Sequence, residues 1–171
     1  MDIIDVSSLL PTGKKRYKKR LLTGIDTIVL HHSATTSGSP QAFADYHVDH
    51  NKWPGIGYHG VVGKEGETWK TNEPETISYH AAGTNGRSLG ICMIGNFDKE
   101  VPGEAQMDAA VELCRYYMDV FPGIKNVLGH RETGSKKTCP GRNVDMVEFR
   151  RRVGLMQMMG VEGDAHNEGM A

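Results

Sequence analysis

Two histidines and one cysteine, His31, His130 and Cys139, are the residues of this chain whose types best suit a metal ion. Zinc favours imidazole and thiolate ligands, and a catalytic zinc site combines three protein ligands with one open position. His31 and His130 each end an apolar segment, and Cys139 lies nine positions after His130. This spacing permits a zinc site but does not demand one, because eight histidines in 171 residues make chance groupings common.

The segments around these residues show the patterns of an α/β domain. Apolar, β-branched runs predict strands at residues 25–31, 57–63, 67–70, 88–95 and 126–129, with one more short strand before His80. Apolar spacing and capping residues predict helices that begin at Ser39-Pro40, span residues 104–120, and begin at Asp145. We therefore expect an α/β fold, with a single mixed central β-sheet of about five to six strands flanked by helices. The zinc cleft is expected at the strand ends.

The composition is that of an ordinary globular protein, with 38% hydrophobic residues, 24% charged residues and a formal net charge of −1. A chain of this length fits one domain. We expect an N-terminal arm with a basic run at residues 1–24, a catalytic domain at residues 25–153 and a Met- and Gly-rich C-terminal tail at residues 154–171. The basic run at 14–20 is either a solvated face or a surface that attracts anionic polymers. No module that reads a nucleic-acid groove accompanies it, so we expect no nucleic-acid partner.

Several classes of protein are excluded by the cysteines and the N-terminus. Three cysteines without compact spacing do not form the disulfide framework of a small secreted domain. Residues 1–5 lack the basic start and apolar stretch of a signal peptide. No run approaches the roughly 20 apolar residues of a membrane span. We therefore expect synthesis in a reducing cytoplasm without a signal peptide, and no membrane span.

Four sequence blocks occur in the order and with the gaps of a known family. They are Ile28–Thr35, Gly57-Tyr58-His59, His80 through Phe97, and Gly129-His130-Arg131-Glu132 with Lys137-Thr138-Cys139-Pro140-Gly141. These blocks resemble the type 2 N-acetylmuramoyl-alanine amidases, which include phage lysozymes of the amidase type and the animal peptidoglycan recognition proteins. The resemblance covers residues 25–153, so this segment is expected to be a zinc amidase domain.

The resemblance implies roles for five residues. His31, His130 and Cys139 would bind one Zn²⁺ ion per chain, although strand alternation alone leaves the choice between His31 and His32 open. Tyr58 matches a tyrosine that orients or helps to deprotonate the attacking water. Lys137 matches a basic residue beside the oxyanion that develops on the scissile carbonyl.

The resemblance also implies an activity, which is hydrolysis of the amide bond between N-acetylmuramic acid and L-alanine in bacterial peptidoglycan. We expect a monomeric phage or prophage endolysin that acts on the cell wall after release. One alternative is a non-catalytic module that binds muropeptide; that branch has lost the cysteine ligand, whereas Cys139 stands in its motif here. A second alternative is a zinc hydrolase that acts on another acylated amino sugar or peptide.

Other polar and aromatic residues receive more modest predictions. His80 and Asn85 lie on a segment that resembles the substrate wall of the family, and we expect them to contact substrate. His47 and His50 are expected to pack or face solvent, and His59 to make a structural hydrogen bond. Partial burial is predicted for Trp53 and Trp69, and an apolar core position for Cys92 and Cys114.

Overall fold

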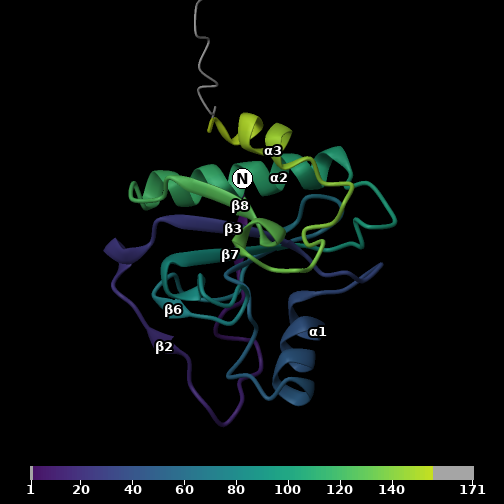
Figure 1. The fold of residues 1–171 in the computed structure, drawn as a ribbon. Coiled ribbons are helices and arrows are strands. Elements are labelled where there is room, and N and C mark those ends of the chain that lie inside the picture. Colours follow the sequence, from purple (N-terminus) through teal and green to yellow (C-terminus); the bar gives the residue numbers. More distant parts are fainter. Residues whose placement is uncertain (1, 156–171) are drawn as a thin grey trace, which may run out of the picture.

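The computed structural model describes residues 2–155 and places a mixed sheet of six strands at the centre of the molecule (Figure 1). Residues 156–171, which make up most of the predicted tail, lie outside the described residues. The strand order across the sheet is β1-β5-β4-β7-β3-β8. The strands are β1 (Ile3–Asp5), β3 (Thr27–His32), β4 (Gly60–Val62), β5 (Thr68–Lys70), β7 (Ser88–Met93) and β8 (Asn126–Gly129).

The central strands β4, β7, β3 and β8 run parallel to one another, whereas β5 is antiparallel to β4. Every residue of β3 and of β7 is buried. Parallel strands covered on both faces need apolar side chains on both sides, which explains the uninterrupted apolar runs of the sequence. The prediction of a mixed α/β sheet flanked by helices is confirmed.

Helices cover both faces of this sheet (Figure 1). On one face, α2 (Glu104–Val120) and α3 (Met146–Val153) pack over Ile28, Leu30 and the alternate residues of β7. On the other face, α1 (Pro40–Asp45) buries Ala44 against Val61 and Cys92. Successive side chains of a strand point to opposite faces. His31 therefore projects to the α1 face, together with Cys92, its pairing partner on β7.

Capping side chains begin two of these helices where the sequence predicts them. The Ser39 hydroxyl accepts a hydrogen bond from the Ala42 amide, and Pro40 occupies the first turn of α1. The Asp145 carboxylate accepts from the amides of Val147 and Glu148 at the start of α3. After Asp45 the chain continues as a π-helical turn, Tyr46–His50.

The predicted N-terminal arm contributes two strands. β1 pairs in parallel with β5 at the sheet edge, and β2 (Lys18–Lys19) pairs with β6 (Thr76–Ile77). Most of the basic run is exposed, but the Arg20 guanidinium points inward and donates to the carbonyls of Pro74, Asn85 and Ser88. Pro74 and Asn85 lie outside the strands and Ser88 begins β7, and Arg20 supplies a hydrogen-bond donor to all three carbonyls.

The predicted strand at 57–63 is shorter in the structure because side chains replace its first main-chain partners. The Gly57 amide donates to His47 Nδ1 at 3.0 Å, and the Thr71 hydroxyl donates to the Tyr58 carbonyl at 2.7 Å. Regular pairing begins only at Gly60. Among residues 2–155, no helix has the length and apolar character needed to cross a bilayer.

Buried imidazoles make the stability of the metal-free protein sensitive to acid. Burial lowers the pKa of His47 from 6.5 to about 4 and holds the pKa of His59 well below its usual value. The unfolded chain binds more protons than the folded chain between these values, so the stability present above pH 6.5 falls as pH drops towards about 4. Urea unfolding at several pH values measures how steeply the free energy of unfolding falls with pH. His47→Asn keeps an acceptor for the Gly57 amide but does not titrate, so the free energy of unfolding of this variant should depend less on pH. An unchanged pH dependence would contradict this role of His47.

Candidate metal centre

Two neighbouring parallel strands deliver the two candidate histidine ligands to one edge of the sheet. His31 is the penultimate residue of β3, and His130 follows β8 directly as the first residue of a 3₁₀ turn. β3 and β8 are paired from Thr27 to Leu30 on β3, so their carboxyl ends lie side by side (Figure 1). Cys139 lies on the loop that follows this turn, and the Arg131 amide donates a hydrogen bond to the Cys139 carbonyl at 2.7 Å.

The ligand atoms of His31, His130 and Cys139 lie within 4.8 Å of one another. Cys139 Sγ is 3.5 Å from His31 Nδ1, and the two imidazole centroids are 4.6 Å apart. Donor atoms that each sit roughly 2.0–2.3 Å from a common tetrahedral zinc ion are about 3.5 Å apart. The donor types and their spacing therefore fit Zn²⁺.

The protonation states of the two imidazoles also suit metal ligands. Burial lowers the pKa of His31 and of His130, and the nearby Lys137 ammonium lowers both further. Neutral imidazoles present the lone pair that a metal requires. Burial raises the pKa of the Cys139 thiol to about 11, so a divalent cation is the partner that would make its thiolate form favourable there.

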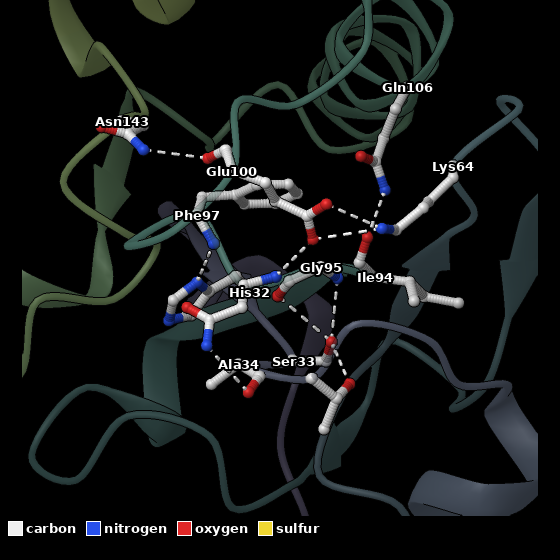
Figure 2. A network of polar contacts seen from close by, with 12 residues as sticks. His32, Ser33, Ala34, Lys64, Ile94, Gly95, Phe97, Glu100, Gln106 and Asn143 are labelled. Atoms are coloured by element: carbon white, nitrogen blue, oxygen red, sulfur yellow. Dashed lines mark hydrogen bonds and ion pairs between the residues drawn. The ribbon is translucent and has the colours of Figure 1, made fainter.

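His32 points away from this cluster. Its Nδ1 accepts a hydrogen bond from the Phe97 amide at 3.0 Å (Figure 2). A one-residue shift along a strand moves a side chain to the other face. The geometry thus identifies His31 as the candidate ligand and excludes His32, a choice that the strand pattern alone leaves open.

The loop that follows β7 holds the end of β3 in place (Figure 2). The Gly95 amide donates to Ser33 Oγ at 3.0 Å, and the Asn143 side chain donates to the Glu100 carbonyl at 3.0 Å. The Glu100 carboxylate pairs with Lys64 at 2.9 Å. Residues 94–100 therefore connect the strand that carries His31 with the segment that follows Cys139.

Two charged residues that sequence reasoning did not single out restrain the Cys139 loop. The Asp98 carboxylate accepts from the Thr138 hydroxyl at 2.6 Å and from the Arg142 amide at 2.9 Å. The Arg131 guanidinium donates to the Gly141 carbonyl at 2.6 Å. These contacts restrain the residues before and after Cys139, so the backbone fixes the position of the sulfur.

Two pockets that share Trp53 and Lys137 in their walls lie beside the cluster, and we call them the two lobes of a groove. One lobe, of about 520 Å³, includes His80, Asn85 and His130 in its walls, and the other, of about 890 Å³, includes Tyr58. Trp53 and Lys137 line both lobes and mark their junction. Trp53 and Trp69 are both half-buried, as predicted.

Tyr58 and Lys137 flank the cluster within this groove. The Tyr58 ring centroid is 5.4 Å from that of His31. Burial raises the pKa of Tyr58 well above its usual value, and the neighbouring thiols of Cys92 and Cys139 add to the shift, so the phenol is protonated near neutral pH. The Lys137 side chain is exposed at the junction of the lobes.

His80 and Asn85 line the groove, but much of their hydrogen-bonding capacity is used within the protein. His80 Nδ1 lies 3.1 Å from His31 Nε2, and His80 Nε2 lies 3.3 Å from Ser88 Oγ. Asn85 Oδ1 accepts from the amides of His80 and Ala81. The predicted substrate contacts are thus also structural supports of the groove wall.

Among residues 2–155, His47, His50 and His59 lie outside the three-residue cluster. His47 is buried against Trp53 and Tyr58, and exposed His50 stacks on Tyr46 at 4.6 Å between centroids. His59 Nδ1 accepts from the Gly90 amide at 3.0 Å, which is the structural hydrogen bond predicted for it.

A cluster of two imidazoles and one thiol in an open groove, with one phenol and one ammonium beside it, has the composition of a mononuclear metallohydrolase site. The family model for N-acetylmuramoyl-L-alanine amidase matches residues 21–142, and the chain belongs to this family. The resemblance inferred from the four sequence blocks is thereby confirmed.

Solved structures and animal proteins agree with this assignment. The fold is similar to that of N-acetylmuramoyl-L-alanine amidase LysC from Clostridium intestinale URNW, with a TM-score of 0.78, 26% identity, and coverage of 91% of this chain and 99% of that chain. The Ph2119 endolysin of a Thermus scotoductus bacteriophage has a TM-score of 0.76 and 27% identity, over 89% of this chain and 99% of that chain. Peptidoglycan-recognition protein SC2 of Drosophila melanogaster is 28% identical over 137 residues, 74% of each chain.

Proposed function

We propose that the chain is a zinc-dependent N-acetylmuramoyl-L-alanine amidase that hydrolyses the amide bond between N-acetylmuramic acid and L-alanine in bacterial peptidoglycan. The observation that carries this proposal is the convergence of His31, His130 and Cys139, with ligand atoms within 4.8 Å of one another, beneath a two-lobed groove. Membership of the amidase family supports the choice of bond.

The residues of the chain divide the chemical work. One Zn²⁺ ion held by the cluster would supply an activated water near neutral pH and polarise the scissile carbonyl. Tyr58 would orient the attacking water by hydrogen bonding, in keeping with its raised pKa. Lys137 would stabilise the negative charge that develops on the carbonyl oxygen, because it lines both lobes of the groove.

The groove is suited to a substrate that extends on both sides of the reacting bond. A glycan on one side of the amide and a peptide stem on the other would each occupy a lobe, with Trp53 between them. A substrate held at both ends places its carbonyl reproducibly against the cluster, which is how positioning accelerates a reaction.

The biological setting we propose is that of a phage or prophage endolysin. The similarity to the Ph2119 endolysin over 89% of the chain supports this origin. Such an enzyme is made in the bacterial cytoplasm, reaches the cell wall after release, and acts as a monomer with peptidoglycan as its partner.

A peptidoglycan recognition module without hydrolytic activity is the second candidate. The similarity to peptidoglycan-recognition protein SC2 favours it. The sulfur of Cys139, 3.5 Å from His31 Nδ1, argues for hydrolysis, since with His31 and His130 it would hold a zinc ion through three protein ligands, the number typical of catalytic zinc sites.

Digestion of purified peptidoglycan distinguishes these candidates. Mass spectrometry of the soluble products should show free peptide stems that begin with L-alanine, together with glycan that retains its lactyl groups. Removal of metal by a chelator should stop the reaction, and added Zn²⁺ should restore it. Binding to the wall without any new amino terminus would support the recognition module instead, and cleavage at another bond would refute the proposed specificity.

A further inference from the structure

A chain of hydrogen bonds links the candidate ligand His31 to the backbone carbonyl of Thr84. His31 Nε2 lies 3.1 Å from His80 Nδ1, and His80 Nε2 lies 3.3 Å from Ser88 Oγ. The Ser88 hydroxyl in turn donates to the Thr84 carbonyl at 2.8 Å. All four residues are buried.

One assignment of hydrogens satisfies every contact in this chain. Ser88 has a single hydroxyl hydrogen, and the Thr84 carbonyl, which can only accept, uses it. His80 Nε2 must therefore carry a hydrogen and donate to Ser88 Oγ. A neutral imidazole has one N–H, so His80 Nδ1 is left as an acceptor.

The same assignment of hydrogens determines the tautomer of His31. Because His80 Nδ1 accepts, His31 Nε2 carries its hydrogen and donates it. The free lone pair of His31 is then on Nδ1, the atom that lies 3.5 Å from Cys139 Sγ. The hydrogen-bond chain thus presents the correct nitrogen of His31 to the candidate metal position.

The packing around His80 also fixes the orientation of its ring. Its ring lies against Gly90 of β7, where a Cβ atom would come within 2.6 Å of His80 Cγ. Asn85 Oδ1 accepts from the His80 amide at 3.0 Å and so fixes the backbone of the same residue. Glycine at position 90 is what leaves room for the imidazole in this orientation.

We propose that His80 is a positioning residue for the metal centre, which fixes the tautomer and ring orientation of His31 and is itself oriented by Ser88. This inference rests on the proposed metal centre and deepens it. A hydrogen-bonded partner of this kind orients a metal-binding imidazole and raises its basicity, and its loss typically lowers metal affinity about 10- to 100-fold.

Two substitutions at position 80 separate hydrogen bonding from packing. His80→Phe keeps a planar ring but removes the acceptor for His31 Nε2, and should weaken zinc binding by about 10- to 100-fold. His80→Asn offers Oδ1 as an acceptor near the position of His80 Nδ1 and should recover part of this loss. Ser88→Ala removes the hydrogen bonds of the hydroxyl with His80 and Thr84 but keeps the contact between His80 and His31, and it should have the smallest effect.

Zinc affinity of the full chain is measured by competition between the metal-free protein and a chromophoric chelator, and urea unfolding of the metal-free variants reports folding. The visible spectrum of the Co²⁺ form supplies a second readout, because a rotated imidazole changes the ligand field. His47→Phe is the matched control, since it removes another buried imidazole that accepts a backbone amide. It should lose stability and keep its zinc affinity.

The outcomes are distinct. Equal zinc affinities of wild type and His80→Phe, or equal losses in His80→Phe and His80→Asn, would overturn the positioning role. Should His80→Phe fail to fold, His80→Ala, which also removes the acceptor, takes its place, and an unchanged zinc affinity in that variant would overturn the positioning role. Absence of stoichiometric zinc from the wild type would instead refute the proposed metal centre itself.

Discussion

Replacement of Cys139 by alanine is expected to abolish stoichiometric zinc binding and to reduce peptidoglycan cleavage to background. The substitution removes the only thiolate of the cluster and leaves two imidazoles, one ligand short of a catalytic zinc site. Metal analysis of the purified protein and release of peptide stems from purified walls measure the two effects.

The fold should survive this substitution. The Cys139 loop is held by the Asp98 carboxylate and the Arg131 guanidinium, and neither contact uses the sulfur. Cys114→Ala is the matched control: this thiol is also buried, but it lies on α2 among core residues. The control should lose some stability while it keeps metal and activity. Full activity of Cys139→Ala would refute the ligand set.

Replacement of Lys137 by alanine is expected to lower kcat by about 100- to 1,000-fold, the usual cost of removing one donor to a developing oxyanion. Zinc content should not change, because the ammonium is not a ligand of the cluster. Steady-state rates on a soluble muropeptide, with zinc content measured in the same samples, test both statements.

A neighbouring lysine provides the control for this variant. Lys136 is exposed like Lys137 but does not line either lobe of the groove. Lys136→Ala removes the same charge from the same loop and should leave kcat near that of the wild type. Equal losses in the two variants would indicate a general electrostatic effect, and an unchanged rate in Lys137→Ala would remove Lys137 from the mechanism.

Local patterns predict the elements well where one physical rule dominates. The bounds of α2 follow from apolar spacing along 104–120 and from Pro122-Gly123, which cannot continue a helix. The start of α3 follows from the capping carboxylate of Asp145. The strand at 57–63 is overestimated, because side chains distant in sequence bond its first residues and no local pattern reveals them.

In the candidate site, too, some features follow from local sequence and others depend on residues distant in sequence. Residue types identify two imidazoles and a thiol, but only the resemblance to a family distinguishes His31 from His32. Asp98 acts on a hydroxyl 40 positions away, so nothing near it in the sequence indicates its role. Gly90 is different, because a glycine inside an apolar strand indicates that another group packs closely against the backbone there. In the structure this group is the His80 ring.

The main-chain pairing of β3 with β8 has a consequence for how the protein acquires its metal. The two imidazoles come together as the sheet forms, and Asp98 and Arg131 restrain the thiol by contacts that need no ion. The apo and loaded forms should therefore share nearly the same shape, with little ordering left for the ion to induce. A chain built in this way can mature before its ion arrives and exchange that ion without unfolding.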